Sequence, residues 1–180
     1  MENICTERLL LTPWRDCEQD AKELYDYAKD KDVGPSAGWK PHESVEESRE
    51  IIRQLFIKNN TWAIREKVSG KIIGSISLEN DRRREDVKSM EMGYSLSKEH
   101  WGKGYMTEAV NSVLKYGFEN MGLSIITANC YAENSRSRSV LKKCGFIYEG
   151  TLRSCALSCD GVLHGCEFYS ITIDEYKKAV

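Results

Sequence analysis

Two glycines separated by one residue, Gly102 and Gly104, constrain this chain more than any other feature. They follow a strand-like run and precede a segment with apolar residues at helical spacing, namely Met106, Ala109, Val110, Val113 and Leu114. Glycine lets the backbone turn its N–H groups toward a ligand and lets that ligand approach closely. A helix that begins there adds unpaired N–H groups and the positive end of its macrodipole. The pattern predicts a site for a phosphate or pyrophosphate at this helix start.

Length and composition predict one folded domain over residues 1–180. Apolar residues make up 41% of the chain and charged residues 30%, which is typical of a globular protein with a proper core. The formal net charge of -2 excludes a broad electrostatic attraction to nucleic acid or to acidic membranes. The basic run Arg82-Arg83-Arg84 lies between Asp81 and Glu85-Asp86, and we interpret it as a solvated loop whose charges compensate one another. We therefore expect neither a nucleic-acid nor a membrane partner.

The N-terminus and the cysteines favour a cytoplasmic location. Met1 to Cys5 does not show a basic start followed by an apolar stretch, and no apolar run is long enough to cross a membrane. The odd number of seven cysteines suits a reducing compartment, where cysteine acts as a small buried hydrophobe. Exposed aromatic residues could form a dimer face, but the sequence pattern does not show where such a face lies. Both a monomer and a homodimer therefore stay open.

One group of metal-ligand residues lies near the C-terminus, within twelve residues: Cys155, Cys159, His164 and Cys166. The group lacks the Cys-x-x-Cys spacing that is usual for structural zinc. It also falls on an expected hairpin that turns at Asp160-Gly161. We expect ordinary strand cysteines here and no metal.

The periodicity of the chain predicts an α/β protein built around one mixed sheet. Helices are expected over 16–30, after the capping box Ser44–Glu47, from the glycine pair to about 118, and over 134–143. Strands are expected over 8–12, 61–66, 71–78, 89–96, 125–131, 146–152 and 167–173. In the strand at 89–96, apolar side chains alternate with Glu91, Gly93 and Ser95, which is the period of a strand.

Several short motifs in this order resemble the GCN5-related N-acetyltransferases (GNAT), and within them the Rim-type acetyltransferases of ribosomal-protein N-termini. The motifs are Thr6-Glu7-Arg8-Leu9, Met92-Gly93-Tyr94, Trp101-Gly102-Lys103-Gly104-Tyr105, Thr107-Glu108-Ala109, Asn134-Ser135-Arg136-Ser137, Lys143-Cys144-Gly145-Phe146 and Glu149-Gly150. The resemblance spans nearly the whole chain and implies a mostly antiparallel sheet of seven strands with about four helices. It also implies that the strands at 89–96 and 125–131 splay apart.

The resemblance implies acetyl-CoA as the cofactor, with coenzyme A as the product. Its pyrophosphate is expected on the loop and helix start formed by Trp101, Gly102, Lys103, Gly104, Tyr105, Met106 and Thr107. The family usually has Gln or Arg where this chain has Glu99, a small departure because backbone amides make the main contacts. The pantetheine arm is expected to enter the splayed gap like an added strand, beside Tyr94, Ser95 and Leu96 on one side and Asn134 and Ser137 on the other. Asn134 is equally suited to cap a helix.

Acetyl transfer to an amine needs a group that removes a proton from the amine and a group that protonates the thiolate. Glu91 is our candidate base, directly or through water, and the open alternative is a strand carboxylate paired with a neighbouring cation. Many relatives place a tyrosine acid where this chain has Leu141, so the resemblance suggests Ser137 instead. A backbone N–H near Leu96 would polarise the carbonyl of the thioester. We expect direct attack in a ternary complex.

The acceptor is the least constrained part of the function. The resemblance places its pocket between the region of Trp39 and His42 and the final hairpin, with Tyr169 as a further candidate. Trp39 is equally suited to packing, and His42 to a solvated loop. We expect the α-amino group of a protein N-terminus. The alternatives are a small amine, such as a polyamine near Glu43, Glu46 and Glu47, or a non-catalytic module that only binds acyl-CoA.

Overall fold

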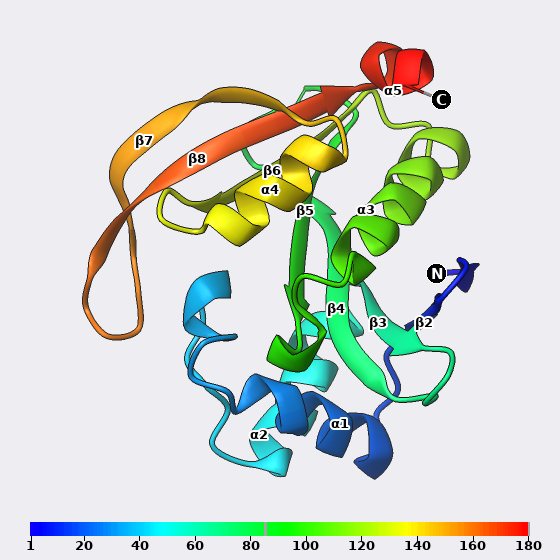
Figure 1. Ribbon diagram of the computed structural model, residues 1–180, viewed down its shortest axis with the longest axis vertical. Coiled ribbons are helices and arrows are strands. Elements are labelled where there is room, and N and C mark those ends of the chain that lie inside the picture. The colour runs from blue at the N-terminus through cyan, green and yellow to red at the C-terminus, as the bar shows by residue number, and fades with distance from the viewer. Residues whose placement is uncertain (85, 180) are drawn as a thin grey trace.

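An eight-stranded sheet forms the centre of the molecule (Figure 1). The computed structural model describes residues 1–84 and 86–179, so Glu85 of the predicted charged loop lies outside the described residues. The strands are β1 (Ile4–Cys5), β2 (Leu9–Pro13), β3 (Asn60–Glu66), β4 (Ile72–Asn80), β5 (Ser89–Leu96), β6 (Ile125–Tyr131), β7 (Ile147–Leu157) and β8 (Leu163–Thr172). Their order is β1-β2-β3-β4-β5-β6-β8-β7, and β5 and β6 form the parallel pair among antiparallel neighbours.

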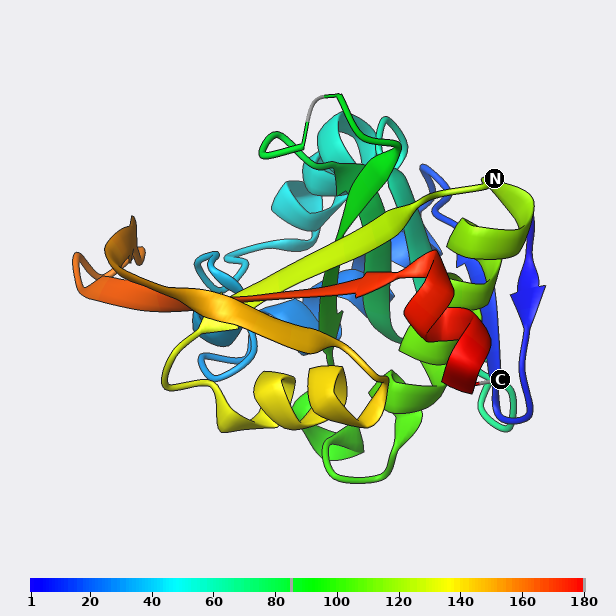
Figure 2. The ribbon, with the colours of Figure 1, turned by 90° about the horizontal axis from the view of Figure 1, so that it is seen from above.

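Helices cover both faces of this sheet (Figure 2). The α-helices are α1 (Glu18–Ala28), α2 (Val45–Ile51), α3 (Tyr105–Lys115), α4 (Ser135–Lys143) and α5 (Ile173–Ala179). The π-turns η2 (Ile52–Phe56) and η4 (Tyr116–Asn120) continue α2 and α3, and the 3-10 turns η1 (Pro35–Ala37) and η3 (Lys98–His100) lie in the loops. The helices α1 and α2 lie on one face of the sheet, and α3 and α4 lie on the other (Figures 1 and 2). The predicted mixed α/β architecture is confirmed.

Two counts from the sequence need correction. The sheet has eight strands instead of seven, because the two residues of β1 pair with Leu10 and Leu11, and so short a strand leaves no periodic pattern. A fifth helix, α5, begins at Ile173, where the periodicity predicts the end of a strand. The predicted turn at Asp160-Gly161 is confirmed, although both strands of its hairpin extend further toward it than expected.

Successive side chains of β4 and β5 point to opposite faces of the sheet, so the buried ones fall into two hydrophobic clusters. Met92 and Leu96 of β5 face α3 and pack in one cluster with Val110 and Val113. The apolar stripe of α1, including Leu24 and Tyr27, packs in the other cluster. The intervening residues Glu91, Gly93 and Ser95 lie opposite Glu79, Ser77 and Ser75 in the β4–β5 register, so they share the face on the side of α1 and α2.

The gap predicted between the strands at 89–96 and 125–131 is confirmed. Pairing of β5 with β6 runs from Ser89–Ile125 to Met92–Ala128 and stops there. Beyond that point β5 remains paired with β4 up to Leu96, while β6 remains paired with β8 up to Tyr131. The two strands therefore part, and each presents backbone groups along an opening between them.

Candidate active site

A cavity of about 960 Å³ lies in this opening and extends to the start of α3. Of the residues expected to bind the cofactor or to act in catalysis, the following line it: Glu91, Tyr94, Ser95, Leu96, Trp101, Gly102, Gly104, Tyr105, Met106, Thr107, Asn134 and Ser137. Lys103 does not line it, and its carbonyl instead accepts a hydrogen bond of 2.9 Å from the Arg8 guanidinium. Segments far apart in the chain thus meet at one cavity.

The start of α3 leaves several backbone donors free. Gly102 and Gly104 adopt φ of +75° and +79°, a conformation that favours glycine. The first backbone bond of the helix runs from the Glu108 N–H to the Gly104 carbonyl, so the N–H groups of Tyr105, Met106 and Thr107 lack helical partners. No atom lies within 4 Å of a Cβ placed on Gly102, so the space above the loop is open. These features suit a phosphate group.

A partly buried contact with the N-terminal segment fixes this loop. The Glu108 carboxylate accepts hydrogen bonds from the Thr6 hydroxyl at 2.6 Å and from the Arg8 Nε at 2.7 Å. Burial opposes ionisation of Glu108, but the hydrogen bonds from Thr6 and Arg8 outweigh it, so its pKa is lowered. Because Arg8 also holds the Lys103 carbonyl, the distant Thr6-Glu7-Arg8 motif orients the glycine loop.

The far wall of the gap comes from α4. The Asn134 side chain accepts a hydrogen bond of 3.1 Å from the Ser137 N–H, so Asn134 is the N-cap of α4, as one of its two interpretations predicts. The Ser137 hydroxyl lies 2.7 Å from the Tyr94 hydroxyl. Burial raises the pKa of Tyr94, so its phenol stays protonated at neutral pH. Leu141, at the position where many relatives have a tyrosine, is fully buried in the core.

Two carboxylates face each other at the other end of the cavity. Glu91 on β5 is paired directly with Glu79 on β4, and both line the cavity. The Glu91 Oε1 lies 2.7 Å from the Arg83 guanidinium and also accepts from the Asn129 side-chain amide. The alternative of an ion-paired strand carboxylate is therefore seen, although Glu91 also faces the cavity. Arg83 lies over the Phe168 ring, 4.8 Å from its centroid, which fixes it.

The arginine run is more than a solvated loop. Arg82 and Arg83 line the cavity, and Arg84 forms ion pairs with buried Asp81 and with Glu149. Asp81 also accepts a hydrogen bond from Thr127, which ties the loop to β6. The sequence misses this because the partners come from distant strands. Glu79 is missed for a simpler reason: the predicted strand ends at Leu78, whereas β4 continues to Asn80.

The three residues expected to contact the acceptor do not line the cavity. Trp39 packs against the α1–α2 cluster and lies 5.1 Å from the His42 ring. The His42 Nδ1 is held 2.8 Å from the Ser48 hydroxyl, and burial lowers its pKa. Tyr169 is 1% exposed, and its ring contacts the half-exposed Tyr148 ring with the centroids 5.6 Å apart. The structure thus gives each of these side chains a packing or hydrogen-bonding role.

Residues 8–147 match the family model of the acetyltransferase (GNAT) domain. The chain is also 34% identical over 164 residues to the uncharacterized N-acetyltransferase p20 of Bacillus licheniformis, covering 85% of this chain and 86% of that protein. The chain belongs to the GNAT family. It is an acetyltransferase, and acetyl-CoA is the acetyl donor of this family.

Solved structures of the same fold include enzymes for different acceptors. A ribosomal-protein-S5-alanine acetyltransferase from Vibrio fischeri superposes with a TM-score of 0.78 at 26% identity, covering 97% of this acetyltransferase and 98% of that chain. A spermidine N-acetyltransferase from Vibrio cholerae, solved with CoA and spermine, superposes with a TM-score of 0.78 at 21% identity, covering 94% and 98%. The fold is therefore common to protein and small-molecule acetyltransferases.

The residues of this acetyltransferase fit acetyl-CoA. Bound acetyl-CoA supplies an acetyl group activated as a thioester. The free N–H groups at the start of α3 are suited to its phosphates, and the parted edges of β5 and β6 are suited to its amide-containing arm. The Leu96 carbonyl already accepts from the Trp101 indole at 2.8 Å, so Trp101 braces the β5 edge.

The described part of the acetyltransferase contains neither a helix that meets the requirements for spanning a membrane nor a cluster of metal ligands. Among residues 1–84 and 86–179, no helix has the length and apolar character that a bilayer crossing needs. The same residues contain no group of three or more His, Cys, Asp or Glu side chains arranged to hold a metal ion. The cysteines of the hairpin are free thiols.

Proposed function

We propose that this acetyltransferase modifies the α-amino group of a protein N-terminus by direct attack of the amine in a ternary complex. The observation that carries the acceptor class is the charge at the Glu79–Glu91 end of the cavity. Arg82 and Arg83 line that end together with the two carboxylates, so the wall is close to electrically balanced.

A balanced wall favours a peptide over a polyamine. A polyamine carries several positive charges, which Arg82 would repel, whereas a peptide N-terminus carries one charge followed by polar amides. Asn59, Asn80 and Asn129 line the same end and offer hydrogen bonds to such amides. The acidic residues that would favour a polyamine lie elsewhere, because Glu43 and Glu47 pair with Lys40 outside the cavity. The Vibrio fischeri relative is named for such a protein acceptor.

Glu91 and Ser137 are assigned the two proton transfers. The contacts of Glu91 engage Oε1, which leaves Oε2 to accept a proton from the amine, directly or through one water. Ser137 stands across the gap on α4 and donates its hydroxyl proton, with the protonated Tyr94 phenol hydrogen-bonded behind it. Gly93 on β5 carries no side chain and leaves space on the face beside Glu91.

Direct attack is favoured because the thiols that line the cavity are not activated. Cys130 and Cys166 are the cysteines in its wall. Burial raises the pKa of the Cys166 thiol to about 12, and burial also raises the pKa of Cys130. Both groups therefore stay protonated at neutral pH, whereas a covalent route needs a thiolate.

The test is a mass-spectrometric acetylation assay with acetyl-CoA. Peptides with a free Ala or Ser N-terminus are compared with the same peptides blocked at the α-amine but containing an internal Lys, and with spermidine, spermine and free amino acids. The proposal predicts a mass increase of one acetyl group only on the unblocked peptides. Acetylation confined to polyamines or amino acids would overturn the acceptor class, and ping-pong kinetics would overturn direct attack.

A further inference from the structure

Glu79 and its cross-strand neighbour Glu91 differ in the hydrogen-bond and ion-pair partners of their carboxylates. Glu91 has a guanidinium at 2.7 Å and a side-chain amide on Oε1. Glu79 accepts one hydrogen bond of 2.9 Å, from the Ser77 hydroxyl to Oε1. Within residues 1–84 and 86–179, no cationic side chain pairs with Glu79, although it lines the cavity and is exposed. It is thus an anionic group with no cationic partner in the wall of the active site.

The fold holds Glu79 in a defined place. It lies near the end of β4, in register with Glu91, and the hydroxyl of Ser77 on the same face fixes one of its oxygens. Gly93, two residues along β5 from Glu91, pairs with Ser77, and a Cβ there would lie 3.1 Å from the Ser77 Oγ. Because Gly93 has no side chain, the space beside Ser77 and the two carboxylates stays unfilled.

We propose that Glu79 receives the positively charged amine of the acceptor, and that it thereby determines acceptor affinity. This inference rests on the proposed function in that it assumes an acceptor whose amine is protonated in solution, as an N-terminal α-amine largely is at neutral pH. Glu79 draws the ammonium into the cavity through its Oε2, and Glu91, its cross-strand neighbour, then takes the proton. Glu79 is a positioning and specificity residue, and Glu91 remains the base.

The division of roles predicts different kinetics for two otherwise similar substitutions. Glu79→Gln keeps the shape and the bond from Ser77 but removes the charge, so KM for the acceptor should rise about tenfold or more, since a hydrogen bond to a charged group is lost. The kcat and the Kd for acetyl-CoA should change less than about threefold. Glu46→Gln, at an exposed position of α2 that does not line the cavity, is the matched control and should change nothing.

Two further measurements keep the outcome clear. Calorimetric titration of the CoA-loaded protein with an Ala-starting peptide should give about tenfold weaker binding for Glu79→Gln. An aminooxyacetyl peptide, whose terminal amine is uncharged at neutral pH, should bind both proteins within about threefold of each other. An unchanged acceptor KM, or an equal loss for charged and uncharged peptides, would overturn the role of Glu79. If only a polyamine is acetylated, the proposed function fails, and Glu79 is then tested with that polyamine in the same way.

Discussion

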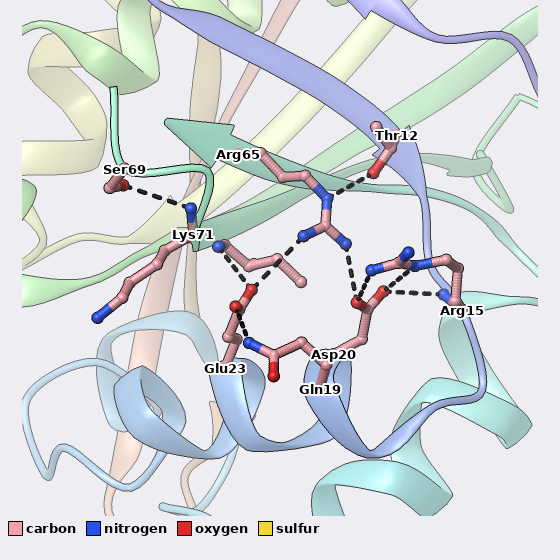
Figure 3. Close-up of polar contacts among 9 residues, drawn as sticks. Thr12, Arg15, Gln19, Asp20, Glu23, Arg65, Ser69 and Lys71 are labelled. Atoms are coloured by element: carbon pink, nitrogen blue, oxygen red, sulfur yellow. Dashed lines mark hydrogen bonds and ion pairs between the residues drawn. The ribbon is translucent and has the colours of Figure 1, made fainter. Parts of the chain in front are cut away.

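Two groups of acidic side chains in this molecule differ in how completely they are paired. On one side of the sheet, Asp20 of α1 has both oxygens filled, with Oδ1 2.6 Å from Arg15 and 2.8 Å from Arg65, and Oδ2 3.1 Å from the Arg15 N–H (Figure 3). In the cavity, the carboxylates of Glu79 and Glu91 each use one oxygen in the contacts found among the described residues.

The difference separates structural polar groups from groups kept for a ligand. The Asp20 side chain is fully buried, and a buried charge persists only when its partners are complete. Figure 3 shows Arg15, from the segment between β2 and α1, and Arg65 of β3 converging on Asp20, which fixes the helix on the sheet. Around the cavity, the free N–H groups of α3 and the free carboxylate oxygens retain capacity for bonds to other molecules. If this view is correct, substitutions in the first region should lower stability, and substitutions in the second should lower binding or turnover.

The largest effect on binding is expected for Gly104→Val. A β-branched residue resists the φ of +79° at this position, so the loop should rearrange and its N–H groups should lose their common direction. Loss of two charge-assisted hydrogen bonds to phosphate would weaken acetyl-CoA binding about 100-fold or more. Isothermal titration with acetyl-CoA measures this.

Gly70→Val provides the matched control for Gly104→Val. Gly70 has a similar φ of +71° in the turn between β3 and β4, and nothing lies within 4 Å of its Cβ position. It should be strained to a similar degree but bind acetyl-CoA normally. An unchanged Kd for Gly104→Val would refute the placement of the cofactor.

The largest effect on stability is expected for Asp20→Asn. Removing the charge leaves the Arg65 guanidinium, which is 13% exposed, without its closest partner, and breaking such a buried pair costs about 3 kcal/mol. For a chain of this size, Tm should fall by roughly 6–12 °C. Asp26→Asn on the exposed side of α1, where Asp26 pairs with Lys29 in solvent, should cost less than about 1 kcal/mol. Equal losses for the two variants would contradict the comparison.

The pH dependence of unfolding gives a second test of Asp20. Burial opposes its ionisation, but the hydrogen bonds from Arg15 and Arg65 outweigh it, and the pKa of Asp20 is lowered. Because the pKa of Asp20 is lower in the folded than in the unfolded protein, its ionised form stabilises the fold. This stabilisation is complete above the pKa of the unfolded state, near 4, and is lost as the pH falls toward the pKa of the folded state. The wild-type protein should therefore lose more stability between pH 5 and pH 3 than Asp20→Asn does, as measured by urea unfolding.

The next effect in size is expected for Glu91→Gln. If the free oxygen of Glu91 accepts the proton of the amine, kcat should fall about 100-fold, with the Kd for acetyl-CoA and Tm nearly unchanged. Arg83→Met removes the ion pair but keeps the carboxylate, so it should lose less activity than Glu91→Gln. A fall in kcat of less than about threefold for Glu91→Gln would assign Glu91 to the structural group.

The sequence predicts the backbone of the site better than its side-chain partners. The glycine pair and the start of α3 follow from local patterns, because backbone geometry depends on neighbouring residues. The parted strands are expected only from the resemblance to the GNAT family. The partners of Glu91 come from the loop after β4 and from β6, and Asp20 meets Arg65 across 45 residues, so no local pattern reveals them. Tyr169 is predicted near the acceptor, but the register of β8 with β6 and β7 turns it into the core.

The smallest effect is expected for Ser137→Ala. This substitution tests whether the Ser137 hydroxyl is a structural group or a group that acts on the ligand. Ser137 has the Tyr94 phenol 2.7 Å away and also lines the cavity, so it is paired but still accessible. If it donates a proton, kcat should fall about tenfold, while Tm and the Kd for acetyl-CoA hold. Tyr94→Phe should lose a similar or smaller factor, and the double variant should lose less than the product of the two because both groups act in one hydrogen-bonded pair. A lowered Tm with unchanged kcat would show instead that the pair only joins β5 to α4, as the Asp20 contacts join α1 to β3.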